Sequence, residues 1–311
     1  MPTTCQNTSR ARRRLAFFAR IGLFGDKPSD VAIQRAMDLE DHWQAYRLVH
    51  DCYVARGYIE PRPEGARVRS FEAMPEMATF VAKSDDRIVA VTGVLMDSPE
   101  LGLPSEGTYG EEIDALRRQQ RRVCEITNLA IDPDYRNTPV FSELTRCCLG
   151  HARAVNYDDL IIAISPEHAR FFRDVLLFEP WGGRRIYCQA TGDEVVGMRL
   201  DLRRLEKRAI EADKALGDRA VLHDFYYASN PYHELVRRWA IRAAGIFTDV
   251  ALLRELFVFR SGLLGRLSAK EAAAIRCRWG ADTFQQVLAE AAVPCSDGDR
   301  AAGGSRLPVA A

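Results

Sequence analysis

A surplus of charge of either sign is missing from this sequence. Lys and Arg together number 43, and Asp and Glu also number 43, so the formal net charge of the 311 residues is +0. A dedicated nucleic-acid-binding protein usually carries a basic surplus, so we expect no nucleic-acid partner. A neutral total still allows a local basic patch for an acidic partner.

Cysteine pairs with the spacing of metal ligands are also missing. The sequence has 8 cysteines but no C-x-x-C motif, and only Cys147 and Cys148 are adjacent. This spacing fits neither a disulfide framework nor a zinc site. We therefore expect no metal and a reducing, cytoplasmic compartment.

Long apolar runs and common catalytic motifs are absent too. No apolar stretch is long enough to span a bilayer. The apolar residues near the N-terminus are interrupted by Arg20 and Gly22, which argues against a signal peptide. The sequence contains no G-x-S-x-G elbow, P-loop, H-E-x-x-H or G-x-G-x-x-G motif, so the chemistry that these motifs mark is not expected.

Residues 1–30 form a basic arm. Arg10, Arg12, Arg13 and Arg14 precede an apolar group that starts at Leu15. One interpretation is an amphipathic segment over residues 10–24 that makes peripheral contact with an anionic membrane face. The other is a flexible tail, or a helix that docks on the body of the protein.

Strand and helix patterns alternate through residues 31–203. We expect strands at 31–39, 77–82, 88–96, 123–131, 160–164, 184–189 and 195–202. We expect helices at 40–56, 111–120, 139–155 and 166–176. The order β, α, ββ, α, β, α, β, α, ββ predicts an α/β (α+β) protein with a mixed central sheet flanked by helices. Residues 204–292 show helical periodicity only, and the Gly-, Ala- and Ser-rich residues 293–311 predict a disordered tail.

The stretch CEITNLAIDPDYR is the most informative one for chemistry. An apolar strand carries Glu125 near its start and breaks at Asp132-Pro133-Asp134. This places an acid on a central strand beside a strand-to-helix turn, where it can accept a proton from an attacking amine. The alternative is that Glu125 only pairs with a neighbouring cation such as Arg121.

Three segments in order, YRLVHDCYVARGYI, EITNLAIDPDYR and SPEHARFFRDVLLFEPWGGRRIY, carry a family resemblance. Residues 31–203 resemble the GNAT acyltransferase fold and, more narrowly, the long-chain N-acyl amino acid synthases, often called FeeM-like. That family is similar to the acyl-homoserine lactone synthases. The resemblance implies an enzyme that moves a long-chain fatty acyl group from acyl carrier protein to the amine of a small amino acid. The donor arm would be 4′-phosphopantetheine, or an acyl-CoA, with no covalently bound cofactor.

The resemblance also assigns roles. Glu125 matches the glutamate that is thought to activate the amine. The lactone synthases carry an arginine three residues later, where this sequence has Asn128, and their first-helix arginine falls on Val49. These departures favour an acceptor other than the one that yields a homoserine lactone. The residues expected to line the substrate side are Tyr53, Thr127, Asn128, Ser165, Phe171 and Phe172.

The reaction also needs an oxyanion hole. The backbone N–H groups of Leu129 and Ala130 can supply it if the strand splays or bulges there. A bulge would also let Glu125 and Asn128 point into one cavity, because strict alternation puts them on opposite faces. The alternatives are that Asn128 is an edge amide satisfied by backbone groups and that Phe171 and its neighbour pack in the core.

The carrier side has its own candidates. The glycine signature that cradles pyrophosphate in acetyltransferases is absent, and Arg136 is expected to meet the pantetheine phosphate instead. Arg146, Arg153 and Arg170 are expected to steer an acidic carrier protein, or else to form an ordinary solvated helix face. Two rival functions remain open, a coenzyme A-dependent acetyltransferase and a non-catalytic acyl-binding module.

Overall fold

The centre of the molecule is one seven-stranded mixed sheet in the order β1-β2-β3-β4-β5-β7-β6. The computed structural model describes residues 4–25, 27–28, 30–136, 138–189, 192–217, 221–243 and 245–289. The β4–β5 pair is parallel and the other neighbouring pairs are antiparallel. The strands are β1 (Val31–Arg35), β2 (Met77–Ser84), β3 (Arg87–Met96), β4 (Val123–Ile131), β5 (Asp159–Ile164), β6 (Glu179–Ile186) and β7 (Glu194–Asp201).

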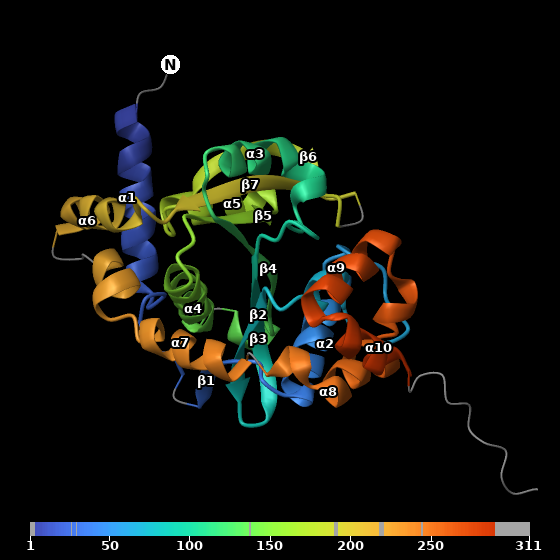
Figure 1. Ribbon diagram of the computed structural model, residues 1–311. Coiled ribbons are helices and arrows are strands. Elements are labelled where there is room, and N and C mark those ends of the chain that lie inside the picture. Colours follow the sequence, from blue (N-terminus) through green and yellow to red (C-terminus); the bar gives the residue numbers. More distant parts are fainter. Residues whose placement is uncertain are drawn as a thin grey trace, which may run out of the picture.

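Helices cover both faces of the sheet (Figure 1). The helices within the sheet region are α2 (Leu39–Ala55), α3 (Glu106–Arg118), α4 (Val140–Ala154) and α5 (Pro166–Asp174). The others are α1 (Thr4–Arg20), α6 (Leu205–Leu216), α7 (Tyr232–Ala243), α8 (Val250–Arg254), α9 (Ala269–Trp279) and α10 (Ala281–Ala289). In Figure 1, α1, α4 and α6 lie on the left of the sheet, and α2, α9 and α10 lie on the right.

Each face has its own hydrophobic core. On the α4 face, Phe80 and Leu160 of the sheet pack with Leu144. On the α2 face, Leu95 packs with Tyr46 and with the C-terminal helices through residues such as Trp279. Burial of this much apolar surface is the main force that holds the layers together.

The order of elements expected for residues 31–203 is confirmed, and the larger differences in boundaries occur at three elements. The first strand ends at Arg35 instead of residue 39, because Asp38 already caps α2 by accepting from the N–H of Asp41 at 2.8 Å. The helix expected at 111–120 begins at Glu106. The strand expected at 184–189 is β6, which spans residues 179–186.

The first residues of β6 include proline and glycine, which predicted a loop from the sequence. Pro180 is tolerated because β6 is the edge strand of the sheet. Gly182 is required by the close approach of Tyr109, since a Cβ there would lie 2.4 Å from the ring atom Cε1. Sequence patterns that mark loops therefore lie here inside a strand.

The C-terminal extension is helical, as expected. Its chain runs along α4 as α7 and then passes to the opposite face, where α8, α9 and α10 pack together beside α2 (Figure 1). Helix α9 of the extension contacts the short 3₁₀ helix Ser70–Ala73, where the indole Nε1 of Trp279 donates to the carbonyl of Ala73 at 2.7 Å. The predicted tail at 293–311 lies outside the described residues.

The basic arm folds as α1 and docks on the body. Leu15 is buried, the Arg14 guanidinium pairs with Asp174 at 2.9 Å, and Phe18 meets Phe171 edge-on at 5.0 Å. Within the described residues, no helix combines the length and the apolar character needed to cross a bilayer.

Candidate active site

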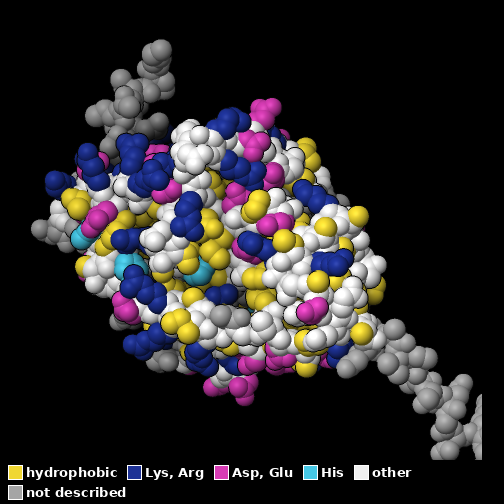
Figure 2. Space-filling model, in the orientation of Figure 1, with side chains coloured by type: hydrophobic (Ala, Val, Ile, Leu, Met, Phe, Trp, Pro, Cys, Tyr) yellow, Lys and Arg dark blue, Asp and Glu magenta, His cyan; other side chains and the backbone are white. Residues whose placement is uncertain are grey.

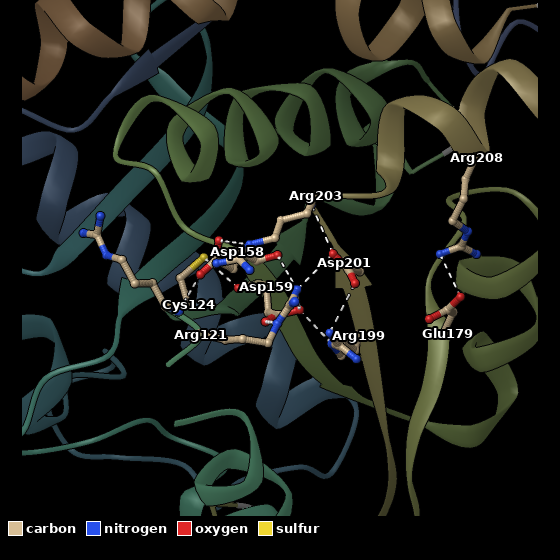
Figure 3. Close-up of polar contacts among 10 residues, drawn as sticks. Arg121, Cys124, Asp158, Asp159, Glu179, Arg199, Asp201, Arg203 and Arg208 are labelled. Carbon is tan, nitrogen blue, oxygen red and sulfur yellow. Dashed lines mark hydrogen bonds and ion pairs between the residues drawn. The ribbon is translucent and has the colours of Figure 1, made fainter. Parts of the chain in front are cut away.

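An ion-pair network joins the start of β5 to the end of β7 and to Arg121, which lies just before β4 (Figure 3). Asp159 lies at its centre and is fully buried. It accepts from Arg121 at 2.9 Å and from Arg199 at 2.7 Å, and Arg121 also reaches Asp201 at 2.9 Å. Such a network clamps the three strands at one end because each carboxylate meets two cations.

At the other end β4 and β5 separate, while β5 stays paired with β7. The β4–β5 ladder consists of Val123–Asp159, Cys124–Leu160 and Glu125–Ile161 pairs, and it stops there although both strands continue. The edge of β4 that faces β5 therefore has no strand partner from residue 126 onward. The splaying that the sequence hypothesis required is confirmed.

A bulge in β4 accompanies the splay. Thr127 pairs with Gly93 and Ala130 pairs with Val91, so two residues of β4 oppose one residue of β3. Asn128 takes the left-handed conformation, with φ of +54°, which asparagine tolerates better than most residues. The predicted bulge is confirmed, and it turns Asn128 to the side of the sheet on which Thr127 contacts Arg69.

A cavity of about 430 Å³ lies in the gap between the separated strands. This volume is typical of sites for small molecules. Its walls come from β4, β5, α1, α2, α4, α5 and the β6–β7 hairpin. The lining includes Phe18, Leu23, Tyr53, Arg67, Ile126, Thr127, Asn128, Leu129, Ala130, Arg136, Phe141, Ile162, Ile164, Ser165, Phe171, Phe172, Tyr187, Asp193 and Val195.

One part of the cavity is apolar. Its rings come from Phe141, Phe171 and Phe172, which contact one another edge-on at 5.7 to 6.2 Å. Phe18 and Leu23 from the N-terminal arm extend this wall. An aliphatic chain would bury its surface here without leaving a polar group unpaired.

The other part is polar and cationic. The side-chain oxygen of Asn128 accepts from Arg67 at 2.7 Å and from Arg69 at 3.1 Å. The amide nitrogen of Asn128 donates to Glu72 at 2.8 Å, and Glu72 pairs with Arg69 at 2.7 Å. Burial alone would raise the pKa of Glu72, but the nearby arginines outweigh it and lower the pKa. The Arg67 guanidinium also lies over the ring of Tyr53, 5.1 Å from its centroid.

Glu125 is buried behind this polar end. It is 1% exposed, and its Oε2 accepts from the N–H and the hydroxyl of Ser105 at 3.0 and 2.8 Å. Burial raises its pKa to about 7, although the bonds from Ser105 oppose the shift. A carboxylate with this pKa can exchange a proton near neutral pH.

The alternative role for Glu125, pairing with a neighbouring cation, does not occur among the described residues. Arg121 belongs to the ion-pair network around Asp159. The guanidinium of Arg122 lies over the ring of Tyr157, 4.5 Å from its centroid.

Glu125 does not itself line the cavity, so the expectation that it points into the same cavity as Asn128 is wrong. Its carboxylate turns to Ser105 instead. Tyr187 does line the cavity. Burial, and to a lesser extent the negative charge of Glu125, raise the pKa of Tyr187 well above its usual value, so the two side chains are electrostatic neighbours.

The structure brings most of the predicted site residues into one cavity. Both proposed oxyanion donors, Leu129 and Ala130, are in its wall, as is Arg136 at the exposed rim. All six residues expected on the substrate side also line it, namely Tyr53, Thr127, Asn128, Ser165, Phe171 and Phe172. Asn128 is satisfied by side chains and not by backbone groups.

Three predicted carrier-side arginines lie outside the cavity. Arg146 is held by Glu143 at 2.7 Å and by the carbonyl of Phe225 at 3.1 Å, so its donors serve internal packing. Arg153 stacks over Tyr227 at 4.2 Å, on the side of α4 that faces α7. Arg170 instead lines a separate depression next to the cavity, together with Arg14, Phe18, Pro166, Glu167 and Phe171.

Sequence reasoning missed the cationic end of the site. Arg67, Arg69 and Glu72 come from the loop after α2 and the following 3₁₀ helix, which carry no periodic pattern. The run Arg-Val-Arg-Ser-Phe-Glu was the available signal, because it alternates charged and apolar residues next to a Pro-rich loop. Ser105 and Tyr187 were also missed.

Metal binding finds no support in the part of the chain that the structure describes. It contains no group of three or more His, Cys, Asp or Glu side chains that could hold an ion.

Comparisons with known proteins show the family and the fold of this chain. The family model for N-acyl amino acid synthase FeeM matches residues 44–201, just over half of the chain. The solved structure of FeeM, an N-acyl amino acid synthase from uncultured soil microbes, is 21% identical with a TM-score of 0.51, and it covers 57% of this chain and 93% of that chain. This likeness shows that the two proteins share the GNAT-like fold.

Two acyl-homoserine lactone synthases are more distant. The CoA-dependent BjaI, solved with MTA, is 16% identical with a TM-score of 0.43 and covers 68% of this chain and 99% of its own. LasI is 14% identical with a TM-score of 0.41 and covers 55% of this chain and 89% of its own. No curated protein matches the sequence significantly.

Proposed function

Because the chain belongs to the N-acyl amino acid synthase FeeM family, we propose that it moves a long-chain fatty acyl group from acyl carrier protein to the amine of an amino acid. The product would be an N-acyl amino acid. The donor would enter on the 4′-phosphopantetheine arm of the carrier, with acyl-CoA as the other possible source of the same thioester.

The observation that carries this proposal is the two-sided cavity. Its apolar wall of Phe141, Phe171 and Phe172 suits an aliphatic chain, and its cationic end at Arg67 suits a small charged acceptor. The two ends meet where β4 leaves β5. A thioester carbonyl held at that point would face the acceptor amine.

Glu125 is the proposed base. An amino acid's ammonium group must lose a proton before nitrogen can attack the thioester carbonyl. Because Glu125 lies behind the wall, the proton would reach it through a water molecule or through the hydroxyl of Tyr187. As the C–N bond forms and the C–S bond breaks, the sulfur leaves as a thiolate with a pKa of about 8.5, which needs little help from an acid.

The backbone of β4 is proposed to stabilise the tetrahedral intermediate. Leu129 and Ala130 line the cavity directly after the bulge, on the part of β4 that has left β5. A backbone N–H held rigidly at this point would donate to the oxyanion, and preorganised donors of this type often supply the largest share of catalysis.

The carrier protein is proposed to dock at the rim formed by α1 and α5. Arg136 stands at the mouth and suits the pantetheine phosphate, and Arg170 lines the adjoining depression. Figure 2 shows dark blue Lys and Arg side chains over the region of α1. The exposed Arg10, Arg12 and Arg13 on this helix would steer an acidic carrier.

Peripheral membrane contact is a second proposed use of the arm. Phe17 and Ile21 are 47% and 56% exposed and lie beside the exposed arginines of α1. Sedimentation with anionic and neutral vesicles tests it, and the paired change Phe17→Ser and Ile21→Ser should abolish binding to anionic vesicles. Equal sedimentation of the changed protein would contradict this use.

The experiment that tests the function is mass spectrometry of products. The protein is incubated with amino acids and, in separate reactions, with long-chain acyl carrier protein, long-chain acyl-CoA or acetyl-CoA. Long-chain N-acyl amino acids from the carrier donor are the expected result. Acetylated products alone would indicate an acetyltransferase, and saturable carrier binding without product would indicate an acyl-binding module.

A further inference from the structure

Arg67 is a buried cation that faces the cavity. Its side chain lines the cavity wall although the residue is only 3% exposed. Its guanidinium donates to Asn128 at 2.7 Å and lies over the ring of Tyr53. A guanidinium carries five N–H donors, so these contacts leave most of its capacity for a ligand.

The charge of Arg67 has no carboxylate opposite it. Among the described residues, no Asp or Glu oxygen lies within 4.0 Å of its nitrogens, whereas Arg69 pairs with Glu72 at 2.7 Å. Burial, followed by the charge of Arg69, lowers the pKa of Arg67 to about 10. The Nη1 of Arg69 is also buried without a partner in the described part of the chain. An anion at this place would meet donors that are already desolvated and oriented.

The position of Arg67 restricts what that anion is. Asn128, which Arg67 touches, is followed directly by the proposed oxyanion donors at Leu129 and Ala130. In an α-amino acid, a single carbon separates the amine from the carboxylate. A carboxylate on Arg67 would therefore leave the amine beside the bulge of β4, where the thioester carbonyl is expected.

The pantetheine phosphate fits this place poorly. That phosphate is joined to the surface of the carrier protein and so must stay near the mouth of the cavity. Arg56 and Arg136 are exposed arginines of the lining, whereas Arg67 is buried.

We propose that Arg67 binds the carboxylate of the acceptor, so that the enzyme selects amines with a free carboxylate one carbon away. This inference rests on the proposed function, which supplies the amine and the acyl donor. Arg69 supports the site through Asn128 and Glu72, and Tyr53 fixes the plane of the guanidinium by stacking.

The test uses two ligands that differ at one group, N-dodecanoylglycine and N-dodecanoylglycinamide. Their binding to the full chain is measured by calorimetry, without any acyl donor. The acid should bind about 10- to 100-fold more tightly than the amide, because the guanidinium then pairs with a carboxylate instead of a neutral amide. Arg67→Gln should remove this difference, and Arg153→Gln, which changes an arginine outside the cavity, should leave it intact.

Outcomes against the inference are equally definite. Equal binding of acid and amide to the unchanged protein, or no binding of either, overturns it. So does a loss of affinity for phosphopantetheine in Arg67→Gln with the acid preference retained. If Arg67→Gln does not fold, Arg67→Lys keeps the charge but loses the planar pair of donors, and the acid preference should still fall.

Turnover separates this inference from the proposed function. If amides form equally well from amino acids and from amino acid amides, the carboxylate site is wrong while the acyltransferase assignment stands. If the acid preference depends on Arg67 but no donor gives any product, the carboxylate site stands and the assigned reaction is wrong.

Discussion

The side-chain amide of Asn128 joins Arg67 to Glu72 across the bulge of β4, with hydrogen bonds of 2.7 and 2.8 Å. The backbone of Asn128 is left-handed at the same place. One residue thus sets both the shape of the strand and the position of the buried charges beside the cavity. Its side chain and its backbone can be tested separately.

Replacing Asn128 should therefore lower the free energy of unfolding through two separate effects. Asn128→Gly keeps the backbone conformation but removes the amide, and we expect a loss of about 2 to 3 kcal/mol in the free energy of unfolding because buried charges lose a partner. Asn128→Ala should cost about 1 kcal/mol more, since alanine also resists the left-handed conformation. Urea denaturation measures both values. Equal losses would show that the backbone at this position is not strained.

Activity should depend on pH through Glu125. With the amino acid limiting, kcat/KM should rise with pH through an inflection near 7, because Glu125 accepts a proton only when ionised and burial raises its pKa to about 7. Glu125→Gln should lower kcat/KM by about 10² to 10⁴ and remove this inflection.

Ionisation of the amine affects the unchanged and variant proteins alike, so the difference between their pH profiles isolates the side chain. Tyr187→Phe serves as a second variant. It should reduce the rate but keep the inflection, because the carboxyl group remains. Identical profiles for the unchanged protein and Glu125→Gln would remove Glu125 from the mechanism.

Stability should change with pH through the same group, in the opposite sense to activity. The pKa of Glu125 is raised from 4.5 in the reference state to about 7 in the folded protein. Its contribution to stability is therefore present at low pH and is lost as the pH rises through 7. We expect Glu125→Gln to gain roughly 2 to 3 kcal/mol relative to the unchanged protein between pH 5 and pH 8. A constant difference across this range would contradict the raised pKa.

The C-terminal helices should influence the acceptor end of the site. Trp279 donates to Ala73, and Glu271 accepts from Ser70 at 2.7 Å, so α9 holds the 3₁₀ helix that carries Glu72. Trp279→Phe should cost about 1 to 2 kcal/mol in stability and raise KM for the amino acid more than KM for the acyl donor. Steady-state kinetics with each substrate varied in turn provides the measurement.

A matched control for that change lies on the other face of the sheet. Trp239 of α7 packs against Phe80 and Tyr232 on the α4 side. Trp239→Phe also removes an indole from a partly buried position, but it leaves the Ser70–Ala73 segment untouched. An equal shift in acceptor KM for both variants would mean that α9 has no special influence on the site.

Much of the cavity wall could be predicted from the sequence because its signals are local. Strand periodicity and the Asp-Pro-Asp break located β4, and the splay and bulge expected near Asn128 are present. The cationic residues of the acceptor end could not be predicted in this way. Arg67 reaches the cavity only because Ser70–Ala73 is packed between the sheet and helices 200 residues later in the chain, such as α9, and no periodic pattern reports contacts at that separation.

The charge pattern of α4 gave a wrong prediction, because its arginines contact residues far away in the sequence. Arg146 and Arg153 have the spacing of a solvated basic face on α4, but α7 and the π-helical turn Asp224–Ala228 cover that face and take up their donors. The fate of a helix face depends on what later packs on it, which is a long-range property.

One surface of α1 faces solvent and another faces the cavity. Arg10, Arg12 and Arg13 are exposed to solvent, while Phe18 lies in the wall that would surround the acyl tail, and Leu23 just beyond the helix lies in the same wall. Any shift of this helix on meeting a partner would therefore enlarge or shorten the space for aliphatic carbons. Docking of the proposed carrier on this helix would thus be coupled mechanically to the length of acyl chain that the cavity accepts.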